Sequence, residues 1–206
     1  MRVLLFLILL LTLQSCAIKK DVKKRLLPEE IKSVTEEIYK VVNNQKQLLQ
    51  KKQMVFTRNG CIKYSKTVDA TGNLLQETKK KLWFIVESYP DKESYYCKTR
   101  WKPGQRERIS CYTRKQYKQS ESIYHYNADG TIDKIVDNFT TFYTQYFYYT
   151  NNQLSRIIVR DKNDKFIDEI AVSCDAKDEK GTCLKETRVL ASTNNKEEIL
   201  LFPNYD

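Results

Sequence analysis

From about residue 53 to its end, the chain alternates between short stretches rich in aromatic and β-branched residues and clusters of turn-forming residues. Aromatic and β-branched side chains favour strands, whereas Gly, Pro, Asn and Asp favour turns. The stretches include CIKYSKTV, KLWFIVES, SYYCKTRW, RISCYTRK and SIYHY. The sequence therefore predicts a mainly β domain over 53–206, built as an antiparallel meander of successive hairpins.

The turns of two predicted hairpins follow one pattern. YHYNADG (124–130) and YFYYTNN (146–152) are each followed by apolar residues at similar offsets. Gly130 and Asn152 occupy the same place, where the turn requires a positive φ and tolerates Gly or Asn. Two weaker copies are RDKNDKFIDEI and VDATGNL. We therefore expect a positive φ at Gly130 and Asn152.

This repeated unit resembles the tyrosine-containing hairpin repeats of bacterial YD (Rhs-type) surface proteins and related envelope lipoproteins. The resemblance implies a twisted sheet in which each hairpin buries its face on the next. It also implies a scaffold or binding role instead of catalysis. The alternative, that turns in any meander look alike, stays open.

Apolar side chains recur at helical spacing just before this β domain, at Ile31, Val34, Ile38, Val41 and Val42. Pro28 stands at a favoured first helical position, and Leu48 and Leu49 can continue the apolar stripe. The sequence predicts an amphipathic helix over about 28–50 that packs on one face or end of the sheet. The helix and the sheet would form a single domain, 28–206.

Residues 1–15 have the features of an export signal. Met1 and Arg2 precede the apolar run VLLFLILLLTL, which is shorter than the roughly 20 residues that a membrane-spanning helix needs. A positive start, an apolar centre and small residues at the boundary are typical of a signal peptide that is removed. We therefore expect the mature chain to be exported.

The four residues LQSC, at positions 13–16, resemble the lipobox of bacterial lipoproteins, with Gln14 in place of the commoner Ala or Ser. The resemblance implies cleavage before Cys16 and attachment of acyl chains such as palmitate to that residue. Two or three acyl chains give stable membrane anchoring where one does not. Ala17 in place of Asp implies sorting to the outer membrane. The alternative is an ordinary secretory signal with a chance cysteine.

The formal net charge of +10 and the basic segment KKDVKKR (19–25) bear on the partners. An exported chain meets anionic lipid or polymer more often than nucleic acid, and each basic residue near such a surface contributes about 1 kcal/mol. We expect 16–27 to be a lipidated basic tether, with a solvated linker as the alternative. The predicted partners are the membrane and either an envelope protein or an anionic surface component, with no nucleic acid.

Two cysteine pairs are candidates for disulfides, which export permits. Cys97 and Cys111 lie almost equidistant from the turn KPGQ, and Cys174 and Cys183 bracket the polar loop DAKDEKGT. Such placement predicts two hairpin staples. Cys61 is left outside both pairs as a buried thiol, although it could displace a member of the first pair.

No pattern in the sequence indicates catalysis, a metal or a cofactor. His125, the one histidine, lies between two tyrosines, and a chain with five glycines has no Gly-rich phosphate loop. The segment RDKNDKFIDE (160–169) has acidic residues that faintly suggest a calcium loop, but Lys165 and Phe166 occupy the wrong places. We predict no catalytic residue, no metal site and no cofactor.

The predicted hairpin around Cys97 and Cys111 carries a dense set of basic residues. The candidate binding residues are Arg100, Trp101, Lys102, Arg106 and Arg108. Arginine and aromatic residues are favoured at binding hot spots, while the alternative is a solvated hairpin that protects a sheet edge. The sequence thus predicts a membrane-anchored, non-enzymatic binding or structural module of the bacterial envelope. Its alternatives are an immunity lipoprotein against an exported toxin and a hydrolase of cell-wall glycans.

Overall fold

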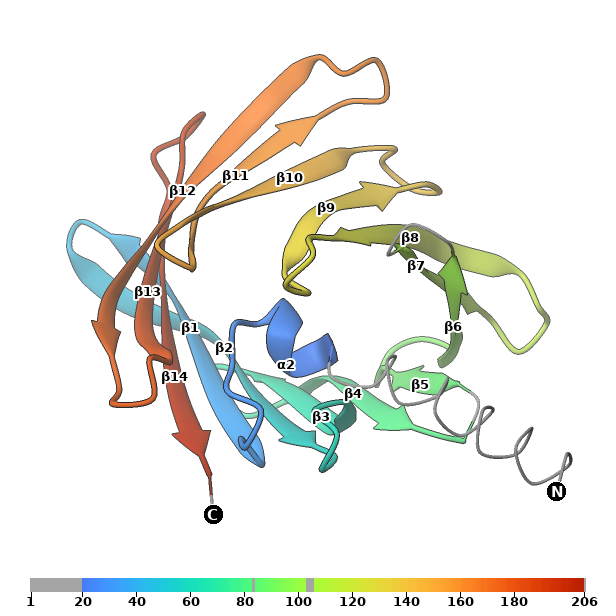
Figure 1. Ribbon diagram of the computed structural model, residues 1–206. Coiled ribbons are helices and arrows are strands. Elements are labelled where there is room, and N and C mark those ends of the chain that lie inside the picture. The colour runs from blue at the N-terminus through green and yellow to red at the C-terminus, as the bar shows by residue number, and fades with distance from the viewer. Residues whose placement is uncertain (1–19, 83, 103–105, 206) are drawn as a thin grey trace, which may run out of the picture.

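A computed structural model describes residues 20–82, 84–102 and 106–205, and all of its strands lie in one closed antiparallel barrel (Figure 1). The elements, in chain order, are α2 (Lys20–Lys24), β1 (Ser33–Val42), β2 (Gln45–Phe56), β3 (Ile62–Asp69), β4 (Leu74–Lys80), β5 (Ile85–Ser88), β6 (Tyr95–Lys102), β7 (Arg106–Tyr112), β8 (Lys118–Tyr126), β9 (Ile132–Asp137), β10 (Thr144–Thr150), β11 (Gln153–Arg160), β12 (Phe166–Lys177), β13 (Cys183–Leu190) and β14 (Lys196–Asn204). The predicted signal peptide and Cys16 lie outside the described residues. Among the described residues, no helix is long and apolar enough to cross a membrane.

The barrel is a meander whose first and last strands pair with each other. Each strand from β2 to β14 pairs with its neighbours in the chain, and β1 pairs with both β2 and β14. In that closing pair Ile38 lies opposite Ile199. Closure removes the unpaired edges that an open sheet would expose. The predicted mainly β, antiparallel meander is confirmed, and its closure into a barrel adds to the prediction.

The predicted helix over 28–50 is wrong, because this segment forms the hairpin of β1 and β2. Val34 and Ile38 are four residues apart, a spacing that puts them on one face of either a helix or a strand. Asn43 and Asn44 decide for the hairpin, since both adopt positive φ values of 50° and 62° that suit a two-residue turn. The many β-branched residues of β1 also favour a strand.

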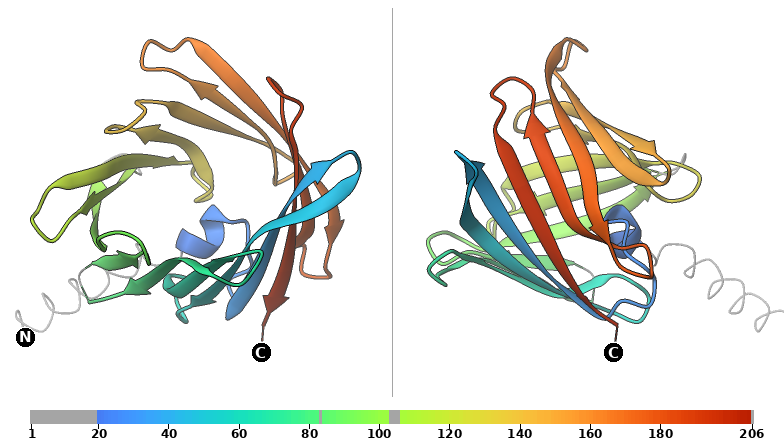
Figure 2. Two further views of the ribbon diagram at one scale, coloured as in Figure 1. Left: turned by 180° about the vertical axis from the view of Figure 1, so that it is seen from behind. Right: turned by 90° about the vertical axis from the view of Figure 1, so that its left-hand side faces the viewer.

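Helix α2 and the residues that lead from it to β1 lie inside the barrel (Figures 1 and 2), whereas the sequence predicted a tether over 16–27. Val22, Leu27 and Ile31 are 0%, 5% and 2% exposed and pack against side chains of β1 and β2 in the main apolar core. The Val22 amide donates a hydrogen bond to the Gly60 carbonyl, and a Cβ on Gly60 would lie 2.7 Å from Val22 Cγ2. Residues 20–31, called the plug below, therefore belong to the folded domain.

The repeated turns have the predicted conformation. Gly130 and Asn152 have φ values of 88° and 59°, and they join β8 to β9 and β10 to β11. Gly72 and Asp164, in the two weaker copies, also have positive φ and join β3 to β4 and β11 to β12. The turns at Gly72, Gly130 and Asp164 share one hydrogen-bonding pattern, whereas Asn151 and Asn152 form a two-residue turn in which both φ values are positive.

Candidate binding site in the barrel lumen

Two cavities inside the barrel meet at α2. The larger has a volume of about 480 Å³ and the smaller about 220 Å³. Both are lined by Asp21 and Lys24 of α2 and by Ile62 and Ile109 of the barrel wall. The helix thus lies between two spaces of unequal size within one lumen.

The larger cavity has a wall of apolar side chains from strands that are distant in sequence. They are Ile38 of β1, Ile132 and Ile135 of β9, Phe147 and Tyr149 of β10, Leu154 of β11, and Ile199 and Leu201 of β14. Alternation along each strand sends these side chains inward and their neighbours outward. Small-molecule sites are typically cavities of about 300 to 1,000 Å³ lined mostly by apolar and aromatic groups, and the larger cavity fits that description.

Each of the three cations that line the larger cavity pairs with a carboxylate. Lys24 Nζ lies 2.9 Å from Glu107 Oε2, and Arg25 Nη1 lies 2.9 Å from Glu36 Oε2. Arg188 Nε lies 2.6 Å from Glu186 Oε1. Partly buried charges are tolerated when each has a partner of opposite sign. The polar part of the lining is therefore close to neutral.

Two buried lysines of the lumen have pKa values shifted in opposite directions. Burial alone would lower the pKa of Lys24, but the nearby carboxylates of Glu107 and Asp21 outweigh it and raise that pKa. Lys52, which lies opposite Glu36 in the sheet, has a lowered pKa because of burial and the charge of Arg25. Positive charge in the lumen is thus best stabilised where α2 meets Glu107.

Two tyrosines of the lumen remain protonated at neutral pH. Tyr126 donates a hydrogen bond to Glu107, and burial together with the Glu107 charge raises the Tyr126 pKa. Tyr149 donates to the Ile132 carbonyl at 2.9 Å, and burial raises its pKa to about 12. These hydroxyls can orient a ligand by hydrogen bonding.

Two cysteine residues line the smaller cavity. Cys61 and Cys97 both line it, and Cys97 is joined to Cys111 in one of the two predicted disulfides. Burial raises the pKa of Cys61, which lies outside both disulfides and is half-buried. Among the described residues, one group of side chains has metal-binding spacing, and it comprises Glu87 and these two disulfide-bonded sulfurs. Sulfurs joined to each other are not thiolate ligands, so this group is not a metal site.

The structure shows on which side of the barrel wall the arginines of the predicted basic hairpin lie. Arg100 lies directly opposite Arg108, and Lys102 opposite Arg106, in the pairing of β6 with β7. Glu107, between the two β7 arginines, points into the lumen, so both arginines point outward. The side chains of Trp101 and Lys102 lie outside the described part of the structure. The basic hairpin therefore presents its arginines to the exterior, away from the lumen.

His125 also belongs to the outer face of the barrel. It lies opposite Arg106 on one side and Lys134 on the other. Burial, followed by the charges of Lys134 and Arg106, lowers its pKa. The chain's one histidine is therefore separated from the lumen carboxylates by the barrel wall.

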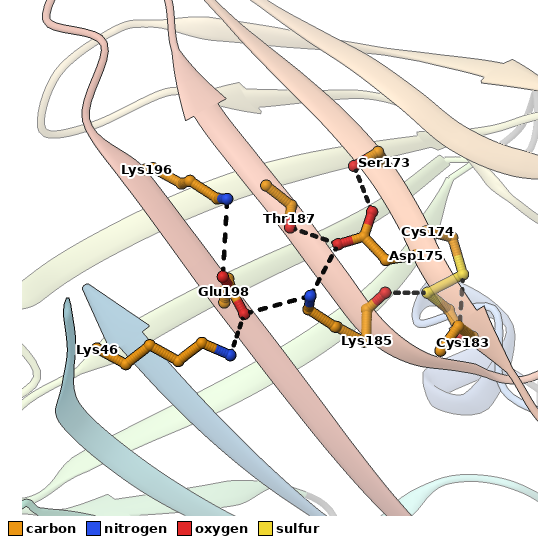
Figure 3. Close-up of polar contacts among 10 residues, drawn as sticks. Lys46, Ser173, Cys174, Asp175, Cys183, Lys185, Thr187, Lys196 and Glu198 are labelled. Atoms are coloured by element: carbon orange, nitrogen blue, oxygen red, sulfur yellow. Dashed lines mark hydrogen bonds and ion pairs between the residues drawn. A yellow bond between two sulfur atoms is a disulfide. The ribbon is translucent and has the colours of Figure 1, made fainter. Parts of the chain in front are cut away.

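A second buried carboxylate cluster lies on the outer face of β12 to β14 (Figure 3). Glu198 is 4% exposed and faces three lysines, the nearest being Lys46 at 2.6 Å. One of the others, Lys185, also lies 3.5 Å from Asp175, which accepts a hydrogen bond from Thr187. These pairs join β2, β12, β13 and β14 beside the Cys174–Cys183 disulfide. This arrangement ties strands together and forms no cavity among the described residues.

Sequence reasoning missed the lumen residues. Glu36, Glu107 and Arg188 belong to three separate strands. Glu107 pairs with Lys24 of α2, and Glu36 pairs with Arg25, the residue after α2. Arg188 pairs with Glu186, two residues earlier on the same strand. A sequence signal was present, since stretches such as SVTEEIYK place acidic residues among apolar ones that face the interior. The prediction of a helix over 28–50 prevented its recognition.

No protein-family model and no curated protein matches the sequence. Solved structures with a partly similar fold include the following three. A porin-like protein from Bacteroides uniformis has 10% identity and a TM-score of 0.39, with 78% of this chain aligned to 55% of that chain. A LolA superfamily protein from Nitrosomonas europaea has 7% identity and a TM-score of 0.42, with 91% of each chain aligned. A DUF1329 family protein from Desulfovibrio piger has 10% identity and a TM-score of 0.34, with 84% of each chain aligned.

The chain spans little more than half the length of the porin-like protein, at 55%. At these identities and TM-scores, the likenesses carry no information about what this chain binds. The function is therefore argued from the geometry of the barrel.

Proposed function

We propose that this chain is a lipid-anchored protein of the bacterial envelope that binds a mainly apolar molecule inside its barrel and performs no chemistry on it. The observation that carries the proposal is the larger cavity, with its volume of about 480 Å³ and its apolar wall. A molecule of drug-like size in such a cavity gains about 25 cal/mol for each Å² of apolar surface removed from water. The lumen, with its larger volume and apolar lining, supports binding of an apolar molecule better than the outer hairpin does.

The state of the ionisable groups supports binding without catalysis. A general acid or base must be able to exchange a proton with the substrate at the working pH. The lumen carboxylates of Glu36, Glu107 and Glu186 each hold a cation. Glycan hydrolysis needs two carboxylates that are available to the substrate, whereas each of these three is already held in an ion pair.

Location in the envelope rests on the leader and the lipobox-like LQSC. Acyl chains on Cys16 would hold the barrel at a membrane, and Ala17 favours the outer membrane. Mass spectrometry of the N-terminal peptide tests this part: the expected result is an acylated Cys16, and an unmodified peptide would contradict it.

Binding in the lumen is tested with N-phenylnaphthylamine, a neutral dye that fluoresces in apolar sites. The mature chain with Cys16 replaced by Ser (C16S), which stays in solution, is titrated with the dye. Ile135→Trp, on the cavity wall, fills the lumen and is expected to weaken dye binding by about tenfold, or 1.4 kcal/mol.

Val136→Trp is the matched control, because Val136 is the next residue of β9, is also half-buried and points outward. It should bind the dye as the parent does. Circular dichroism checks that both variants are folded. Equal dye binding by the two tryptophan variants, or no saturable binding by the parent, would exclude the lumen as the site.

A further inference from the structure

The outer face of β6, β7 and β8 has a groove in which cations outnumber acids. Its volume is about 170 Å³, and it is lined by Lys98, Arg100, Arg108 and Lys118 together with Glu121 and neutral side chains. Four cations against one carboxylate leave an excess of three positive charges around a space the size of a small anion. This groove lies on the opposite side of the wall from the lumen and is independent of the function proposed above.

Glu121 cannot neutralise the whole groove, because its oxygens are already occupied. It is 5% exposed and accepts hydrogen bonds from Ser110 at 2.9 Å, Lys118 at 3.0 Å and Asn138 at 3.0 Å. Arg108 Nη1 lies 3.8 Å from it. Lys98 and Arg100 are both exposed, and neither forms an ion pair within the described part of the chain.

The two arginines of the groove face each other across the hairpin. Arg100 of β6 lies directly opposite Arg108 of β7. Like charges in this position destabilise a sheet, so the fold keeps an arrangement that a bound anion would relieve. The Cys97–Cys111 disulfide, one residue before Lys98 on β6, fixes the relative position of the two strands. The backbone positions that carry these cations are therefore set before any ligand arrives.

We propose that this groove binds a phosphate monoester, as presented by a membrane lipid headgroup or by a soluble phosphate. Arginine matches the geometry of phosphate oxygens with paired hydrogen bonds, and lysine adds a compact charge. A monoester carries between one and two negative charges at neutral pH. It therefore balances the excess of three better than a carboxylate or a phosphodiester, each with a single charge.

His125 provides a direct readout of binding. It is the chain's one histidine and lies opposite Arg106, two residues from Arg108 on β7. Its ring signals in an NMR spectrum are therefore unique, and an anion in the neighbouring groove changes their chemical shifts. The full chain, in non-ionic detergent micelles, is titrated with dihexanoyl phosphatidic acid, dihexanoyl phosphatidylglycerol, dihexanoyl phosphatidylcholine and inorganic phosphate.

The expected result is saturable binding of phosphatidic acid, with the diester lipids binding at least about tenfold more weakly. The variant Lys98→Glu with Arg100→Glu should lose about tenfold or more in affinity, since it removes two cations that can donate charge-assisted hydrogen bonds to the phosphate. Lys63→Glu with Lys66→Glu is the control of equal charge change, because both residues are exposed on β3. Its affinity should stay within about twofold of the parent.

Each outcome separates the alternatives. Tighter binding of phosphatidic acid than of inorganic phosphate assigns the site to a lipid headgroup, and equal binding assigns it to a soluble phosphate. Equal affinity for phosphatidic acid and phosphatidylglycerol would overturn the preference for a monoester. No saturation with any phosphate, or unchanged affinity in the Lys98→Glu, Arg100→Glu variant, would overturn the site itself.

Discussion

The inner and outer faces of β7 and β8 bury one glutamate each and surround it in opposite ways. Glu107, 6% exposed on the inner face, accepts from Tyr126 and pairs with Lys24 of the plug. Glu121, 5% exposed on the outer face, takes its partners from β7, β8 and the loop after β9. Equal burial therefore has different consequences, because one carboxylate holds the plug and the other organises a cationic surface.

This difference shows how a single sheet wall separates two kinds of polar environment. On the lumen side, Lys24, Arg25 and Arg188 each have a carboxylate partner, which suits a mostly apolar space. On the outer side, water screens the excess charge of Lys98 and Arg100, so the fold can tolerate it. The same strands can therefore serve an apolar ligand inside and an anion outside.

Removing the inner carboxylate, Glu107, should have the largest effect on stability. Glu107→Ala leaves Lys24, whose side chain is 14% exposed, without its nearest acid and leaves the Tyr126 hydroxyl without its acceptor. We expect the free energy of unfolding, measured with urea, to fall by about 3 kcal/mol. Glu77→Ala is the control, since Glu77 pairs with the half-exposed Lys79 and should lose less than about 1 kcal/mol. Equal losses would show that the plug does not depend on Glu107.

Changing the outer carboxylate should give a smaller effect that depends on pH. Burial alone would raise the Glu121 pKa, but hydrogen bonds from Asn138, Lys118 and Ser110 outweigh it and lower that pKa to about 2. Because the folded value lies below the ordinary 4.5, this stabilisation is present above about pH 4.5 and is lost as the pH falls toward 2. Glu121→Gln should lower the free energy of unfolding by about 1 to 2 kcal/mol at pH 7.

The same variant should show a shallower loss of stability between pH 4.5 and 2 than the parent, as urea unfolding at several pH values would measure. Glu197→Gln, at an exposed position of β14, serves as the control and should follow the parent. Parallel acid profiles for Glu121→Gln and the parent would contradict the assigned role of Glu121.

The smallest expected effect has the opposite sign. Arg100→Glu replaces a like-charge pair with an opposite-charge pair facing Arg108, and we expect a gain of about 0.5 kcal/mol. Thermal unfolding measures this as a small rise in the melting temperature. Lys63→Glu, at another exposed strand position, should not raise it. A destabilised Arg100→Glu variant would mean that the two arginines do not repel each other in the folded protein.

Predictions that depend on neighbouring residues agreed with the structure. Cys97 and Cys111 lie opposite each other with Cα atoms 4.0 Å apart, as their placement about the turn predicted, and Cys174 pairs with Cys183. The positive φ of Gly130 and Asn152 followed from turn chemistry alone. Each of these features is decided within one hairpin, where short loops leave few alternatives.

Predictions about features that depend on contacts between distant residues were wrong or could not be made. The spacing of Val34 and Ile38 fits both a helix and a strand. The turn at Asn43 and Asn44 favours the hairpin, and pairing with the distant β14 then gives β1 its second neighbour in the barrel. The segment KKDVKKR was predicted to be part of a tether because it is basic and follows the lipobox-like LQSC, yet Val22, Leu27 and Ile31 pack against β1 and β2. The lumen could not be located in advance, because its lining comes from strands far apart in the chain.

The sequence by itself determined that this chain would form antiparallel hairpins, with two staples and turns of a repeated type. Those features depend on local backbone preferences and on short loops. Only the tertiary structure decided that the hairpins close into a barrel, that the plug lies inside it, and which carboxylate meets which cation. Closure depends on the summed twist and register of every strand, so it belongs to the whole chain and to no single segment of it.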